Sequence, residues 1–156
     1  MLETPEIAVT PPQQIAVIRC TIPKAAMRDV MGPGIRELIS TVMEQGIGPS
    51  GPWFAHHIRM NPEIFDFEIG VPVTAKVQAT GRVESSLRPE LTVAKAVLRG
   101  GYEGLPAAWP KLDAWVREQG HLSALDLWEC YVAGPETSAD PAQWRTELHR
   151  PLIALK

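Results

Sequence analysis

A degenerate internal repeat limits the folds that are open to this chain. Residues 65–73 align without a gap on residues 144–152, so that Glu68 matches Glu147. Upstream of each copy, an apolar segment ends in the same tripeptide, Glu-Gln-Gly, at 44–46 and at 118–120. The repeating unit is longer than the commonest solenoid repeats, and two copies are too few for a solenoid.

Each copy reads as strand, helix, strand, strand, which predicts an α+β fold. Helical spacing of apolar residues predicts a first helix over 35–46, after the breakers Gly32-Pro33-Gly34. A second apolar stripe predicts a helix over 105–120, and Pro110 inside it predicts a late start or a kink. Apolar or alternating runs predict strands at 15–18, 53–60, 65–73, 91–98, 125–132 and 144–152.

We expect one domain over residues 1–156, with repeat 1 at about 13–79 and repeat 2 at about 90–153. Residues 80–89 read as a connector, and the first dozen residues read as a loose lead-in. One helix covers only one face of each small sheet, so the uncovered faces are expected to meet. This predicts a tandem duplication with pseudo-twofold symmetry, helices outside and a ligand cleft between the repeats.

Charge and composition exclude several classes of partner. A net charge of -3 gives no basic surface for nucleic acid. No apolar run approaches the ~20 residues that span a bilayer, and the first residues do not resemble a signal peptide, so we expect a cytoplasmic protein. The cysteines, Cys20 and Cys130, lack metal or redox spacing, and His56 and His57 point to opposite faces of a strand. We therefore expect no metal and no cofactor.

Glu129 is the main candidate for a functional residue. It lies in the apolar strand expected at 125–132, where alternation places Leu127, Glu129 and Tyr131 on one side. A carboxylate among such neighbours is costly to bury unless it is needed there. We interpret Glu129 as the acid of a pocket on the face away from the helices; the alternatives are an exposed residue or a partner of a nearby arginine.

Alternation adds further candidates. Glu68 and Glu147 are expected opposite the helices, hence on or near the same cleft, although backbone donors at the repeat interface would explain them equally well. Tyr102 either packs at the start of the second helix or faces the pocket. Helical spacing assigns Trp109 and Trp115 to the core. Three residues share one face of the strand expected at 53–60, namely Phe54, His56 and Ile58.

Several motifs carry a family resemblance: Gly-Pro-Trp-Phe-Ala at 51–55, Arg-Gly-Gly-Tyr-Glu-Gly-Leu at 99–105, Trp-Glu-Cys-Tyr at 128–131 and Gly-Pro-Glu at 134–136. With the repeat, and over about 15–152, they resemble the GyrI-like family. Its members are gyrase-inhibitor-like small-molecule-binding domains that also serve as effector-binding domains of AraC-type and MerR-type transcription regulators.

The resemblance implies a stand-alone domain with a central pocket for hydrophobic, often cationic or planar compounds. Glu129 matches the pocket glutamate of the family, Glu68 matches a strand glutamate and Tyr102 matches a tyrosine before the second helix. The sequence departs from many relatives at His56-His57, where a strand tyrosine is common. Histidines in place of this tyrosine would change which ligand charge the pocket prefers, and they would remove any chemistry that the tyrosine assists.

The resemblance also implies an alternative function. Some stand-alone relatives hydrolyse reactive cyclopropane-bearing natural products, which would make Glu129 a general base on water and Tyr102 its assistant. The expected partner is a small-molecule ligand, and a separate regulator or gyrase is a further candidate. We expect a monomer or a weak homodimer.

Overall fold

The computed structural model describes residues 1–23, 26–60, 63–135 and 137–153. The chain divides into two compact units, which we name after their helices. The α1 unit is Pro11–Glu90, and the α2 unit combines Met1–Thr10 with Leu91–Lys156. Prolines lie close to the two points where the chain passes from one unit to the other. A proline has no backbone N–H and therefore cannot extend a strand ladder there.

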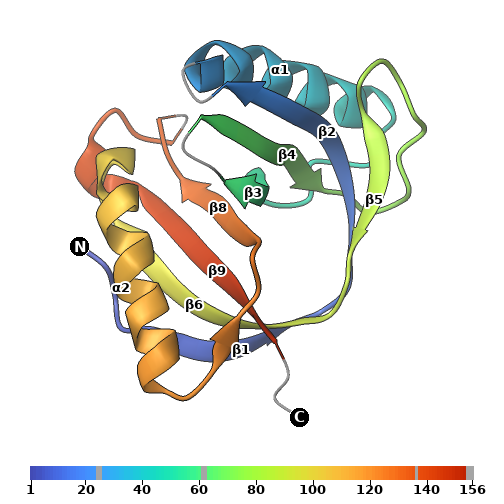
Figure 1. The fold of residues 1–156 in the computed structure, drawn as a ribbon. Helices are drawn as coiled ribbons and strands as arrows, with labels where there is room; N and C mark the ends of the chain where they lie inside the picture. The colour runs from blue at the N-terminus through green and yellow to red at the C-terminus, as the bar shows by residue number, and fades with distance from the viewer. Residues whose placement is uncertain (24–25, 61–62, 136, 154–156) are drawn as a thin grey trace. The chain divides into compact units, whose positions relative to one another are not determined.

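The α1 unit is a four-stranded antiparallel sheet with one long helix beside it (Figure 1). The strand order is β3-β4-β2-β5. Helix α1 contacts β2 and β4, the two central strands. The elements are β2 (Gln13–Pro23), α1 (Met27–Glu44), β3 (Phe54–Met60), β4 (Ile64–Pro72) and β5 (Glu84–Arg88).

Strand β4 separates the two faces of this sheet as its alternation predicts. Phe67, Ile69 and Val71 are buried with Leu38 and Val42 of α1. Side chains alternate along a strand, so the residues between them, including Glu68, lie on the face opposite α1. The predicted orientation of this glutamate relative to its helix is therefore confirmed.

The α2 unit contains a second antiparallel sheet, with strand order β1-β6-β9-β8, and helix α2 contacts β6 (Figure 1). A two-residue strand, β7, pairs with β9. The elements are β1 (Glu6–Thr10), β6 (Leu91–Arg99), α2 (Leu105–Glu118), β7 (Leu122–Ser123), β8 (Leu127–Ala133) and β9 (Arg145–Ile153), with short 3₁₀ helices at Tyr102–Gly104 and Pro141–Gln143.

The core of the α2 unit lies between this sheet and the inner stripe of α2. Leu112 and Val116 of the helix pack with Leu98, Leu127 and Leu148 of the strands. The predicted helical stripe is thus confirmed, and Pro110 stands inside α2. Both units contain the order strand, helix, strand, strand, and the α+β class is confirmed. The duplication, its pseudo-twofold symmetry and the cleft stay predictions.

Three sequence expectations about elements are wrong. Helix α1 begins at Met27 and runs through Pro33, whereas the sequence predicts a start at 35. Residues 6–10 form β1 and residues 84–88 form β5, although both segments read as irregular. Each is a five-residue strand that pairs with a longer neighbour, β6 or β2. Pairing with that neighbour supplies backbone hydrogen bonds that weak local propensity does not predict.

Among the described residues, none of the helices combines the length and the hydropathy that a membrane crossing requires.

Candidate functional site

Glu129 lies on the side of the sheet that α2 covers. In the pairing of β8 with β9, Glu129 stands opposite Leu148, and Leu148 packs in the core beneath the helix. Leu127 belongs to the same core, so alternation places Glu129 and Tyr131 on that face. The shared face of these three residues is confirmed, and the prediction that it points away from the helix is wrong.

Two neutral donors hold the Glu129 carboxylate. The indole Nε1–H of Trp109 donates to Oε2 at 2.7 Å, and the hydroxyl of Tyr131 donates to Oε1 at 2.7 Å. Only 8% of Glu129 is exposed. Hydrogen bonds to a carboxylate are stronger than neutral ones, which offsets part of the cost of burying the acid. Both carboxylate oxygens are therefore engaged inside the α2 unit.

Trp109 is a site residue, although its helical spacing predicts only a place in the core. It lies on the inner stripe of α2 and is buried, as its helical spacing predicts. A buried indole N–H usually finds an acceptor, and a buried carboxylate needs donors. A buried donor and a buried acceptor in one sequence together indicate that Trp109 and Glu129 can pair. The spacing of residues along one helix or strand does not indicate this pair, because Trp109 lies on α2 and Glu129 on β8.

Aromatic rings continue the site beyond Tyr131. Tyr102 meets Tyr131 edge-on, with ring centroids 5.6 Å apart and an interplanar angle of 74°. Its ring also lies 5.2 Å from that of Trp144, the residue just before β9. The Trp144 indole N–H donates to the Ser138 carbonyl at 2.9 Å. Tyr102 therefore contacts the ring of Tyr131, and the Tyr131 hydroxyl contacts the Glu129 carboxylate.

An arginine lies against the ring of Trp109. The Cζ atom of Arg150 is 5.2 Å from the centroid of the Trp109 ring. The guanidinium also binds the Asp113 carboxylate at 2.9 and 3.0 Å, so the cation on the indole is fixed by an acid of α2.

Tyr131 remains a hydrogen-bond donor at high pH. Burial, followed by the charge of Glu129, raises its pKa well above the ordinary value of 10.0. The unfolded chain therefore loses this proton at lower pH than the folded one. Above about pH 10, we expect the free energy of unfolding to fall by up to ~1.4 kcal/mol per pH unit on account of this group. Urea unfolding between about pH 9 and 11.5 measures this decline.

The matched variant for this measurement is Tyr131→Phe, which keeps the ring and removes the titrating hydroxyl. We expect it to flatten the decline, since Tyr131 carries the raised pKa. Equal slopes in Tyr131→Phe and the unmodified chain would show that other groups cause the decline.

Glu147 lies on the other face of the same sheet. It is paired with Cys130 across β8 and β9, next to the Glu129–Leu148 pair, so the two carboxylates point to opposite sides. Its Oε1 is 3.0 Å from Nε2 of His149 and 3.7 Å from Nζ of Lys95. These partners, His149 first, lower the pKa of Glu147. The structure therefore does not bring Glu147 together with Glu129.

The remaining candidates belong to the α1 unit. Phe54 is buried and lies over Gly70, its partner on β4. His56 stands opposite Glu68, with Nδ1 and Oε1 3.2 Å apart. Both pairs lie on the face opposite α1, and Ile58 is half-buried near a break in the register. A ligand-binding role for these residues stays a prediction.

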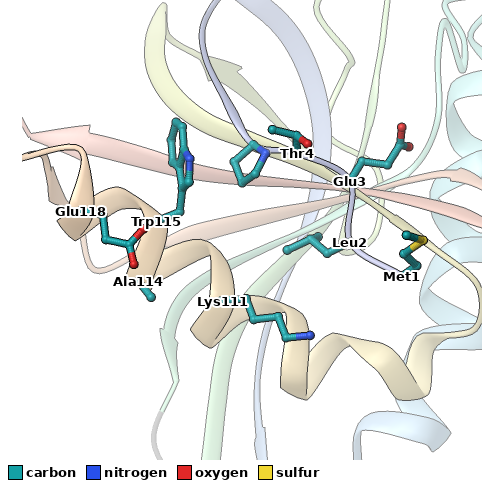
Figure 2. A pocket seen from close by; sticks show the side chains of 9 residues that line it. Met1, Leu2, Glu3, Thr4, Lys111, Ala114, Trp115 and Glu118 are labelled. Carbon is teal, nitrogen blue, oxygen red and sulfur yellow. The ribbon is translucent and has the colours of Figure 1, made fainter.

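One pocket of about 510 Å³ opens beside α2, and it does not include Glu129 (Figure 2). Its lining comes from the helix face that carries Trp115 and from the first five residues. Lys111 and Glu118 lie along the same helix face. Among the described residues, no three His, Cys, Asp or Glu side chains gather closely enough to hold a metal ion.

Solved structures share this fold over almost the whole chain. The EcmrR C-terminal domain has a TM-score of 0.84 and 21% identity, covering 97% of this chain and 98% of that one. The EcmrR chain in a DNA complex has a TM-score of 0.83 and 21% identity; 97% of this chain is covered, and it spans 58% of that chain. At these identities the likeness shows the fold.

More distant structures share it as well. SAV2435, solved bound to tetraphenylphosphonium, has a TM-score of 0.64 and 8% identity, covering 97% of this chain and 95% of that one. A hydrolase from Listeria innocua has a TM-score of 0.66 and 9% identity, covering 96% and 91%. No curated protein sequence matches significantly.

The family match covers nearly all of the chain. Residues 3–153 match the family described as the GyrI-like small molecule binding domain. This agrees with the sequence motifs and with the α+β fold. The chain therefore belongs to the GyrI-like small-molecule-binding domain family.

Proposed function

We propose that this domain binds hydrophobic organic cations, with the Glu129 carboxylate as the anionic anchor. The observation that carries this proposal is a buried carboxylate whose two oxygens are held by Trp109 and Tyr131. Donors without charge leave the negative charge of the acid in place. A desolvated carboxylate beside aromatic rings favours a ligand that brings a positive charge and apolar surface.

The aromatic residues around Glu129 support the same ligand class. Tyr131, Tyr102 and Trp144 follow one another at ring-to-ring distances of 5.6 and 5.2 Å. Aromatic faces attract cations by about 0.5 to 2 kcal/mol, more when water is excluded. Tetraphenylphosphonium, bound in the structural neighbour SAV2435, is a cation covered by aromatic rings. It is a suitable first probe for this domain.

Binding at Glu129 requires the site to open. The acid is 8% exposed and both of its oxygens accept hydrogen bonds, so a cation must displace Trp109, Tyr131 or both. The free energy needed to break these hydrogen bonds weakens the measured affinity of any ligand. For a cation, attraction to the carboxylate offsets this loss, whereas a neutral ligand of the same shape lacks that attraction. We therefore expect selection by charge as well as by shape.

Replacing Glu129 by glutamine tests the anchor. Glutamine keeps the size of the side chain and removes its charge. We expect Glu129→Gln to weaken tetraphenylphosphonium about 10- to 100-fold, since a hydrogen-bonded or paired charge contributes ~1.5–3 kcal/mol. Triphenylphosphine oxide, a neutral compound of related shape, should lose much less. Isothermal titration calorimetry of both ligands against both proteins gives the comparison.

One control variant and two possible outcomes decide this titration. Glu118→Gln removes an exposed acid of α2 and the same unit of net charge, and we expect it to leave both affinities nearly unchanged. Equal losses for the cation and the neutral ligand in Glu129→Gln would remove the anchor role. Absence of binding to the unmodified domain would remove the proposed ligand class.

Hydrolysis of a strained electrophilic ring is the second candidate. The contact between Glu129 and the Tyr131 hydroxyl puts a base next to a proton donor, and the Listeria innocua neighbour is called a hydrolase. In this reading Glu129 activates water once Trp109 or Tyr131 releases an oxygen, and Tyr131 replaces Tyr102 as the direct assistant. The same Glu129→Gln variant discriminates, because an enzyme would lose turnover of cyclopropane electrophiles while retaining them as ligands.

The biological role that fits binding is ligand sensing in transcription. The EcmrR chain, of which this domain spans 58%, occurs in a complex with DNA. By analogy, the ligand state of this domain would be communicated to a DNA-binding regulator. A contact with gyrase is implied only by the family name.

A further inference from the structure

We propose that Arg150 is a positioning residue that holds the Trp109 indole on Glu129 and so restrains the site from opening to cations. The inference rests on the proposed function for its effect on ligands. Its structural part, the placing of the Trp109 ring by Arg150, stands on geometry within the α2 unit and is measured without a ligand.

Arg150 itself is held firmly. All three of its guanidinium nitrogens donate: Nε and Nη2 to the carboxylate of Asp113 at 2.9 and 3.0 Å, and Nη1 to the carbonyl of Asp126 at 3.2 Å. Its side chain is 12% exposed. A two-pronged arginine–carboxylate pair of this kind fixes the plane of the guanidinium as well as its position.

This fixed group lies against Trp109. The Cζ atom is 5.2 Å from the centroid of the indole ring. Asp113 is four residues after Trp109 on α2, so the acid that orients Arg150 and the ring it contacts are neighbours on one helix face. The strand residue Arg150 thereby joins β9 to the part of α2 that carries the indole.

The contact has a direct consequence for Glu129. The same indole donates its Nε1–H to Oε2 of Glu129 at 2.7 Å. When the guanidinium holds the ring, this hydrogen bond stays in place. A ligand cation needs Oε2 of Glu129, which the indole N–H occupies. Arg150 also places a positive charge against the ring of Trp109, and a ligand cation that approaches this ring is disfavoured by a like charge. Both effects oppose cation binding, so removing Arg150 should strengthen it.

The ligand experiment uses Arg150→Gln and Arg150→Lys. We expect both to bind tetraphenylphosphonium about 3- to 10-fold more tightly than the unmodified domain, because each loses the planar, two-pronged contact. If the charge alone mattered, Arg150→Lys would behave as the unmodified domain. Arg117→Gln, an exposed arginine of α2, controls for net charge and should change the affinity little. A merely structural role for Arg150 predicts weaker binding instead.

The ligand-free experiment follows the indole proton by NMR. The Trp109 resonance is assigned by its loss in Trp109→Phe, and its hydrogen exchange is measured in each protein. We expect faster exchange in Arg150→Gln and Arg150→Lys, and also in Asp113→Asn, which keeps Arg150 and weakens its orientation. Circular dichroism identifies variants that remain folded, and Asp113→Asn provides the test if both Arg150 variants unfold.

The two readouts separate the possible failures. Unchanged indole exchange in the folded variants overturns the positioning role, whatever the ligand does. Weaker or unchanged tetraphenylphosphonium binding with faster exchange overturns the restraint on opening. If the unmodified domain binds no cation, the proposed function fails, and the exchange rate alone decides whether Arg150 positions Trp109.

Discussion

Replacing Phe67 by alanine is expected to lower the free energy of unfolding by about 3–5 kcal/mol. Phe67 has no exposed surface and lies in the core between β4 and helix α1. Its ring also stacks against His57, with centroids 5.4 Å apart. Alanine removes the apolar surface that folding buries and leaves a cavity that the surrounding sheet can fill only in part. Few single changes in the α1 unit should cost more.

Urea unfolding measures this loss, with Ile64→Ala as the matched control. Ile64 is on the same strand but is 44% exposed, so its truncation should cost roughly 1 kcal/mol or less. The midpoint for Phe67→Ala should fall while the slope stays close to that of the unmodified domain. Similar losses in both variants would mean that the α1 unit does not depend on this core.

Phe67 also shows where the sequence was sufficient. The alternation around it requires one buried and one polar face, and the observed strand has its apolar residues under α1 and Glu68 opposite. The same holds for the α2 stripe with Leu112 and Val116. In both elements the periodicity of burial matches the backbone geometry, so local pattern and tertiary packing agree.

The face of Glu129 could not be decided in that way. Strand β8 is buried on both sides at its start, with Leu127 on one and Trp128 on the other. Alternation shows which residues of a strand share a face. It does not show which of the two faces packs against the helix when both faces are apolar. The core contacts of Leu127 decide it. This is why the site lies under α2, with Trp109 in it.

The start of α1 differs from its sequence prediction for another reason. Proline and glycine at 32–34 favour a break, yet α1 continues through Pro33. Val30 and Met31, before the proline, and Ile35, after it, all pack on the core of the α1 unit. Burial on both sides of the proline offsets the hydrogen bond that it removes. A prediction from local propensity does not include this contribution.

Gly70→Ala is expected to destabilise the domain by about 1–3 kcal/mol through overpacking. A Cβ atom built on Gly70 would clash with the ring of Phe54, at 2.7 Å from Cε1, and would lie 3.1 Å from the backbone oxygen of Ala16. Phe54 is 5% exposed, and its rigid ring is enclosed, so it cannot swing aside as a flexible surface chain would. The backbone of β2 limits movement on the other side.

A double-mutant cycle with Phe54→Leu tests this explanation. Leucine removes the ring atoms nearest to the added methyl, so Gly70→Ala should cost less in the Phe54→Leu background than in the unmodified domain. A coupling of about 0.5–3 kcal/mol is expected for residues in direct contact. Additive losses would assign the effect to the backbone contact with Ala16 instead. Because Phe54 covers this glycine within its own sheet, the cycle also shows how far its ring serves packing, independently of any ligand.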